Sequence, residues 1–145
     1  MEKSGLRFRM TGKMMHEMFR VFKKRIEDYA DIKITMEQYG LLNAISSEEY
    51  EVIQQDLANV MGKDKSSILR IVDSLEDKEL VRRVVDTKDR RKNCLMVTKK
   101  GEKVITQYTM LEAELMKEIL DGITPLELET FYKVVNHVKV KAGKL

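Results

Sequence analysis

The 145-residue sequence contains one cysteine, one proline and no tryptophan, and it has no long apolar run. A lone thiol, Cys94, cannot form an intramolecular disulfide, which fits the reducing cytoplasm. One cysteine and two distant histidines give no spacing suited to zinc. No segment approaches the roughly 18 apolar residues of a membrane span, and no apolar stretch of a secretion signal is present. We therefore predict a cytoplasmic protein without metal or cofactor.

Composition and charge narrow the class further. The chain is 43% hydrophobic and 35% charged, which is too apolar for disorder and long enough for one domain with its own core. The 27 basic residues exceed the 24 acidic ones by only +3. Any contact with nucleic acid must therefore come from local clustering of charge and not from the overall balance.

The apolar spacing predicts helices in the first part of the chain. Met10, Met14, Met18, Phe22 and Ile26 recur at helical intervals, and a polar break follows at 30–34. Thr35 and Gln38 have the spacing of a capping box, so a second helix should begin there. The segment 52–61 is predicted to be a short helix that stops at Gly62.

The spacing of apolar residues changes from helical to strand-like after the helix that follows Gly62. Asp64 should cap that helix, which should bury Ile68, Ile71, Val72 and Leu75. Two short β-branched segments, 81–85 and 94–97, then flank a polar, turn-prone stretch and predict a hairpin. Thr98 should cap a further helix that ends at Gly122, and Thr124-Pro-Leu-Glu should start the last one. The predicted fold class is mainly α with a small β-hairpin.

Two helices joined by a tight turn and followed by a basic hairpin predict a winged helix-turn-helix. The second helix of such a pair enters the major groove of DNA by its N-terminal end. Small hydroxyl side chains let it approach base edges, and cations contact phosphate or guanine. The candidates are Lys63, Lys65, Ser66, Ser67 and Arg70. The alternative is a solvated first turn in which Asp64 and Ser66 act only as caps.

Positive charge is concentrated in the hairpin, or wing. Residues 82–93 contain six basic and two acidic side chains, a net charge of +4 where the whole chain has +3. An arginine at the tip of an extended loop fits a narrow minor groove. Asp89 would help there only by orienting Arg91 through a bidentate pair. The wing candidates are Lys88, Asp89, Arg90, Arg91 and Lys92, and an ordinary charged turn is the alternative.

From about 53 to 103 the sequence resembles the MarR family of transcriptional regulators. The helix pair, the wing residues Asp86, Asp89, Arg90 and Arg91, and the later Val97, Thr98 and Gly101 match the family pattern in order and spacing. The family usually has glycine before the first wing strand, where this chain has Glu79. That departure bears on the turn, because glycine accepts a positive φ at little cost.

The resemblance implies a homodimer that binds double-stranded DNA at a pseudo-palindromic operator and regulates transcription, which we expect to be as a repressor. It implies a single domain, 1–145. Residues 1–34 and 99–145 would be dimerisation helices, and residues 35–98 a DNA-binding lobe. It places Ser66, Ser67 and Arg70 at the bases, with Arg91 in the minor groove held by Asp89.

Other readings of the sequence point to weaker sites. Family members often hold a small aromatic effector between the dimer helices and the DNA-binding lobe. The candidates here are Met15, His16, Phe19, Met36 and Tyr39, for which plain packing is the alternative. Cys94 lies in a predicted strand without a local base, which favours packing over catalysis, and we predict no enzyme. A winged helix used for protein–protein assembly is the alternative function.

Overall fold

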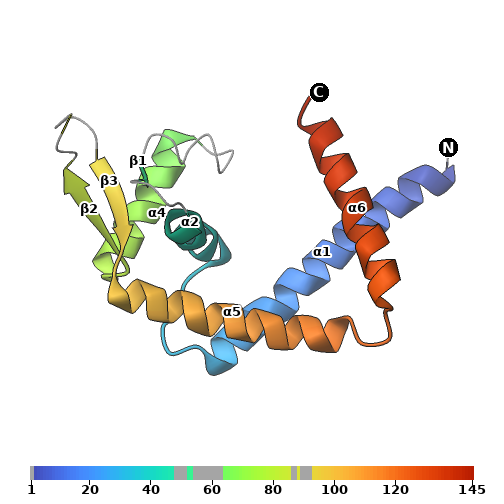
Figure 1. Ribbon diagram of the computed structural model, residues 1–145, viewed down its shortest axis with the longest axis horizontal. Coiled ribbons are helices and arrows are strands. Elements are labelled where there is room, and N and C mark those ends of the chain that lie inside the picture. Colours follow the sequence, from blue (N-terminus) through green and yellow to red (C-terminus); the bar gives the residue numbers. More distant parts are fainter. Residues whose placement is uncertain (1, 48–51, 54–63, 86–87, 89–92) are drawn as a thin grey trace. The chain divides into compact units, whose positions relative to one another are not determined.

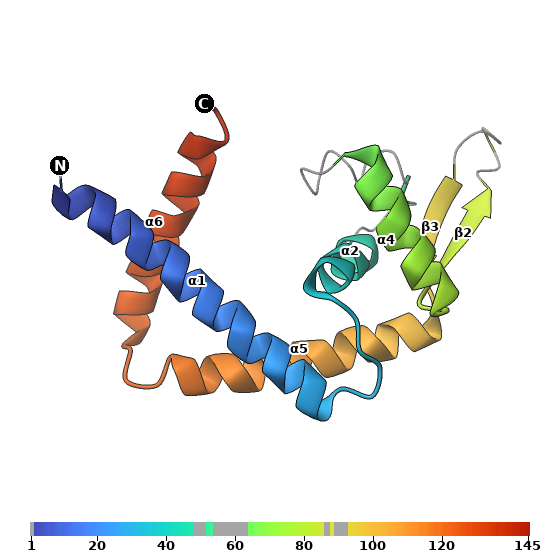
Figure 2. The same ribbon diagram turned by 180° about the vertical axis from the view of Figure 1, so that it is seen from behind.

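The computed structural model describes residues 2–47, 52–53, 64–85, 88 and 93–145 (Figures 1 and 2). The chain divides into two compact units, Met1–Glu112 and Ala113–Leu145, which are described separately. The elements of the first unit are α1 (Glu2–Tyr29), α2 (Met36–Ser47), β1 (Val52–Ile53), α4 (Lys65–Asp77), β2 (Val81–Val85) and β3 (Asn93–Val97). Helix α5 (Lys99–Ile119) begins in the first unit, and α6 (Pro125–Ala142) lies in the second. The predicted fold class, mainly α with a β-hairpin wing, is confirmed.

Helix α4 packs against α2 and β2 in the first unit, as both ribbon views show. Its buried residues are the four that the sequence predicted: Ile68, Ile71, Val72 and Leu75. They recur at spacings of three and four, so they form one apolar stripe along the helix. Leu41 and Leu42 of α2 are fully buried. The helix is therefore fixed to the core along one side and exposes the other.

The sheet has one strand more than the predicted hairpin. It is antiparallel with the order β1-β3-β2, and Val52 and Ile53 of β1 pair with Leu95 and Cys94. The prediction that a helix begins at Val52 is therefore wrong. The physical reason is that two β-branched residues favour extended backbone and satisfy the hydrogen bonds along the second edge of β3. The rest of that predicted helix, 54–61, and its stop at Gly62 lie outside the described residues.

A set of buried polar contacts fixes the joint between α1 and α2. The amide of Ile34 donates to Tyr108 Oη (2.8 Å), which itself donates to the carbonyl of Ile32 (2.9 Å). Burial raises the pKa of the Tyr108 hydroxyl. The predicted capping box is confirmed, since the Gln38 amide donates to Thr35 Oγ1 and Gln38 Oε1 accepts from Thr35 N.

The turn between α4 and β2 keeps the geometry of a glycine turn without glycine. Glu79 has a φ of +61°. The Glu79 amide donates to the carbonyl oxygen of Glu76 (2.8 Å), and the Leu80 amide donates to the carbonyl oxygen of Leu75 (2.9 Å). These two hydrogen bonds define a Schellman motif, and Leu75 and Leu80 occupy the two positions at which that motif usually has apolar side chains. Both leucines are fully buried. The substitution noted in the sequence therefore leaves the turn in place, at a conformational cost to Glu79.

Strand β3 returns to α5 beside the same turn. Thr98 Oγ1 donates to the Glu79 carbonyl (2.6 Å) and accepts from the amide of Gly101 (3.0 Å), so it caps α5 as predicted. A Cβ on Gly101 would lie 2.2 Å from the carbonyl oxygen of Leu80. This close approach of two backbones explains why the position needs glycine.

In the second unit, the predicted start of α6 is confirmed. Thr124 and Glu127 form a capping box, and Pro125 occupies the first helical position. Gly122, at φ +86°, follows the end of α5. No residue of α6 is buried in the single chain. Of the helices in the described part of the chain, none is both long and apolar enough to cross a membrane.

Candidate nucleic-acid interface

The N-terminal end of α4 presents polar side chains from a well-fixed backbone. Asp64 is its N-cap, and Asp64 Oδ1 accepts from the amide of Ser67 at 2.7 Å. That hydrogen bond lowers the pKa of the Asp64 carboxyl. Lys65, Ser66 and Arg70 are exposed, and Ser67 is half-buried. Four of the five candidates Lys63, Lys65, Ser66, Ser67 and Arg70 thus lie within the first two turns of α4, while Lys63 lies outside the described residues.

The wing is described in part. Lys88 is exposed, and strands β2 and β3 pair from Val81 opposite Val97 to Val85 opposite Asn93. Asp89, Arg90, Arg91 and Lys92 lie outside the described residues. The proposed pairing of Asp89 with Arg91 therefore stays a prediction.

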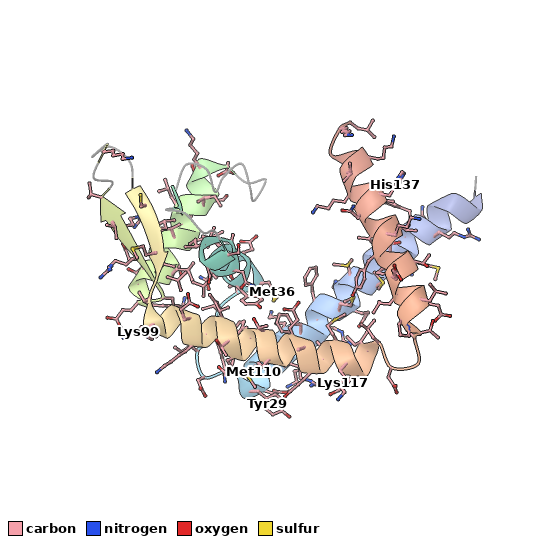
Figure 3. The ribbon with its side chains drawn as sticks, viewed as in Figure 1. Tyr29, Met36, Lys99, Met110, Lys117 and His137 are labelled. Atoms are coloured by element: carbon pink, nitrogen blue, oxygen red, sulfur yellow. The ribbon has the colours of Figure 1, made fainter. Side chains whose placement is uncertain are left out.

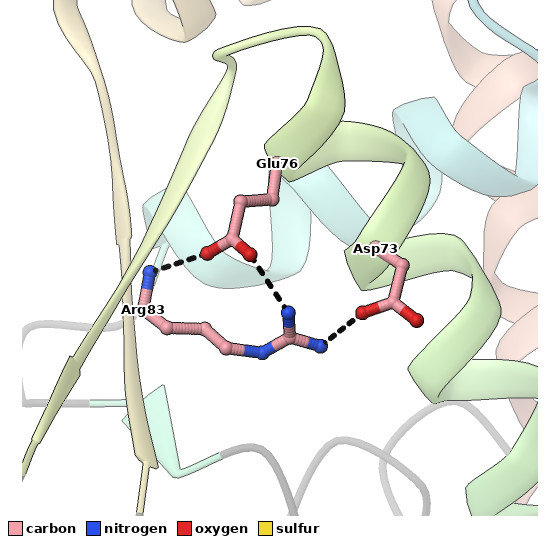
Figure 4. A network of polar contacts seen from close by, with 3 residues as sticks. All are labelled: Asp73, Glu76 and Arg83. Carbon is pink, nitrogen blue, oxygen red and sulfur yellow. Dashed lines mark hydrogen bonds and ion pairs between the residues drawn. The ribbon is translucent and has the colours of Figure 1, made fainter.

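Arg83 is one of the six basic residues within 82–93, and its side chain is bound to α4. Arg83 Nη2 lies 2.6 Å from Asp73 Oδ1, and Nη1 lies 2.9 Å from Glu76 Oε1 (Figure 4). Burial alone would lower the pKa of Arg83, but the two carboxylates outweigh it and raise that pKa. The cation is thus used within the fold to join β2 to α4.

The ion pairs of Arg83 with Asp73 and Glu76 could not be predicted from the sequence. Asp73 and Glu76 are three residues apart and so share one helix face, which is visible from spacing alone. Their pairing with Arg83 depends on the turn at Glu79 reversing the chain, and the spacing did not supply that geometry. The single positive charge of Arg83 offsets one of the two negative charges on α4, and the pairing removes one cation from the wing.

The five candidate effector residues fall into two environments. Met15, His16 and Phe19 are exposed on α1, whereas Met36 is half-buried at the start of α2 (Figure 3). Tyr39 is 5% exposed, and its ring lies 5.1 Å from that of Tyr108.

A groove of about 530 Å³ lies beside α2, and Met36 is the one effector candidate that lines it. Its other lining residues include Lys23, Ile26, Lys33, Ile34 and Lys78. The predicted effector residues therefore do not gather around this groove. Cys94 is buried in β3, in keeping with a packing role.

Comparisons with known proteins agree with this geometry. Residues 32–92 match the sequence model of the MarR family. Among solved structures, FabT of Streptococcus pneumoniae, crystallised in complex with DNA, superposes with a TM-score of 0.84 at 15% identity, covering 97% of this chain and 98% of FabT. The transcriptional regulator BldR of Sulfolobus solfataricus superposes with a TM-score of 0.72 at 29% identity. The match covers 94% of this chain and 96% of BldR. PcaV of Streptomyces coelicolor, crystallised with its natural ligand, superposes with a TM-score of 0.72 at 23% identity. The match covers 90% of this chain and 92% of PcaV.

The three-stranded sheet, the packed α4 and its exposed N-terminal end define a winged-helix protein. Residues 32–92 carry the sequence pattern of the MarR family, and the chain as a whole has a fold similar to those of the transcriptional regulator BldR and of FabT. The resemblance identified from the sequence is confirmed.

Proposed function

We propose that the chain is a sequence-specific DNA-binding transcriptional regulator that acts as a homodimer and represses its targets. The observation that carries this proposal is the end of α4. Lys65, Ser66 and Arg70 are exposed on a helix whose opposite face is buried and whose two ends are fixed by the Asp64 cap and the turn at Glu79. A helix held in this way can enter the major groove with its polar end foremost.

Electrostatics support the same face as the DNA contact. Asp73 would repel phosphate if it were unpaired, but its carboxylate is bound to Arg83 at 2.6 Å. Lys65 and Arg70 supply positive charge, and the small Ser66 leaves room for a base edge. In this proposal Lys63 and Ser67 also contact the DNA. The wing supplies Lys88, Asp89, Arg90, Arg91 and Lys92, with Asp89 orienting Arg91 in the minor groove.

The exposed apolar surface of α6 supports the homodimer. Leu126 is 72% exposed, Phe131 42%, Tyr132 51% and Val138 56% in the single chain. So many large apolar side chains on one exposed helix favour burial against a second copy, with an interface on the order of 2,000 Å². We assign dimerisation to 1–34 and 99–145 and DNA binding to 35–98. A two-fold dimer predicts a pseudo-palindromic operator.

A small aromatic effector would regulate the dimer by preferring one arrangement of its DNA-binding lobes. The PcaV structure, which holds a natural ligand, supports looking for one. Met15, His16, Phe19, Met36 and Tyr39 remain the candidates for lining its site. A screen of aromatic acids should find a compound that changes both the melting temperature and DNA affinity, and a screen without any such compound would refute this part.

The test of DNA binding is a fluorescence-anisotropy titration of a duplex selected from a random pool. We expect Arg70→Ala to weaken binding by about 1–3 kcal/mol, because it removes a base or phosphate contact. The matched control is Lys117→Ala on α5, which also removes one exposed cation and should leave affinity within twofold. Affinity should fall steeply as salt rises. Equal effects of the two variants, or salt-independent binding, would contradict the proposal and favour a protein-assembly module.

A further inference from the structure

An exposed leucine lies on the face of α4 that the proposed function assigns to DNA. Leu69 is 42% exposed, whereas Ile68, Ile71, Val72 and Leu75 of the same helix are exposed by 8% or less. Residues three and four apart are neighbours on a helix surface, so Leu69 lies next to Ser66, Lys65 and Asp73. Those three side chains are also exposed. Leu69 is therefore an exposed apolar side chain surrounded on the helix surface by polar ones.

The position of Leu69 along the helix suits contact with a base. It lies one turn, about 6 Å, beyond Lys65 and directly before Arg70 in the sequence. Leu69 adds less to the stability of the fold than the buried residues of α4, because 42% of it stays in water. The surface around it is not blocked by an unpaired anion, since Asp73 is bound to Arg83 at 2.6 Å (Figure 4).

We propose that Leu69 is a specificity-determining residue that reads thymine, through contact between its methyl groups and the C5-methyl group in the major groove. This inference rests on the proposed function. Among the four bases, thymine alone carries a methyl group in that groove. Lys65 and Arg70 hold the helix on the duplex by charge, and Leu69 adds an apolar preference at one base pair of each half-site.

The test replaces single thymines of the selected duplex by deoxyuridine, which removes the methyl group and leaves every hydrogen-bonding atom in place. For the wild-type chain, one thymine position in each half-site should be sensitive. Loss of the methyl there should weaken binding about fourfold, as expected for one buried methyl-sized group. The other thymines should show ratios close to one.

The variant Leu69→Ala should bind both duplexes with equal affinity, because it can no longer contact the methyl group. Leu69 is exposed, so the variant is expected to fold, and circular dichroism checks this. The control is Met110→Ala, which removes a 60% exposed apolar side chain from α5, outside the DNA-binding lobe. Whatever it does to dimerisation and to overall affinity, it should keep the fourfold ratio. The readout is a ratio of two affinities for one protein, so a general loss of affinity does not affect it.

Two results would overturn this inference while leaving the proposed function intact. One is a Leu69→Ala variant that still discriminates thymine from deoxyuridine fourfold. The other is a wild-type chain that binds the selected duplex tightly but is indifferent to the methyl group at every thymine. Failure of the proposed function would look different, because no duplex would be enriched from the random pool.

Discussion

Replacing Glu79 by glycine should stabilise the protein. Glu79 has a φ of +61°, a region that costs a residue with a Cβ about 1–2 kcal/mol. Glycine adopts it freely but loses about 0.5–1 kcal/mol more backbone entropy on folding. The side chain contributes little, because it is 82% exposed and its ion pair with Lys100 is 3.6 Å long. We therefore expect Glu79→Gly to raise the free energy of unfolding by about 0.5–1 kcal/mol.

The assay is thermal unfolding at fixed protein concentration, because the midpoint of the proposed dimer would depend on concentration. For a chain of this length the gain corresponds to a rise in Tm of about 2–3 °C. Glu79→Ala is the control: it removes the same carboxylate but keeps the Cβ, and it should not raise Tm. If Glu79→Gly is no more stable than Glu79→Ala, the reasoning from backbone strain is wrong.

Three further predictions concern the turn, the network and the wing. Gly101→Ala should cost about 2–4 kcal/mol in urea unfolding, because its Cβ would overlap the carbonyl oxygen of Leu80; an unchanged midpoint would refute the close approach. Arg83→Lys should lower the free energy of unfolding by about 1 kcal/mol, since an ammonium cannot bridge two carboxylates as the guanidinium does; equal stability would show that the network is dispensable. Arg91→Ala should weaken DNA binding by about 1–3 kcal/mol, and Asp89→Ala should weaken it too despite removing a negative charge; tighter binding by Asp89→Ala would leave the wing as a plain basic patch.

The sequence predicted those parts of the fold that depend on local patterns. The buried stripe of α4 follows from helical spacing, and the caps at Asp64 and Thr124 follow from side chains that reach nearby amides. Such contacts span three or four residues, so they can be seen without knowing the tertiary structure.

The parts that could not be predicted depend on distant segments meeting. Val52 and Ile53 form a strand only because β3 lies beside them, more than 40 positions later in the sequence. Arg83 is withdrawn from the basic wing because the turn at Glu79 brings it to Asp73 and Glu76. The residues of the candidate site could be predicted from the sequence. Which of its charges are paired could not, because that depends on the tertiary structure.

The most direct test of the central claim is selection of bound duplexes from a random DNA pool by this 145-residue chain. A two-fold dimer that places one α4 in each of two major grooves should enrich an inverted repeat, with half-site centres about 10 base pairs apart. The enriched duplex should bind two chains. A pool with no enriched sequence after several rounds, or enrichment of a single asymmetric half-site, would contradict the account.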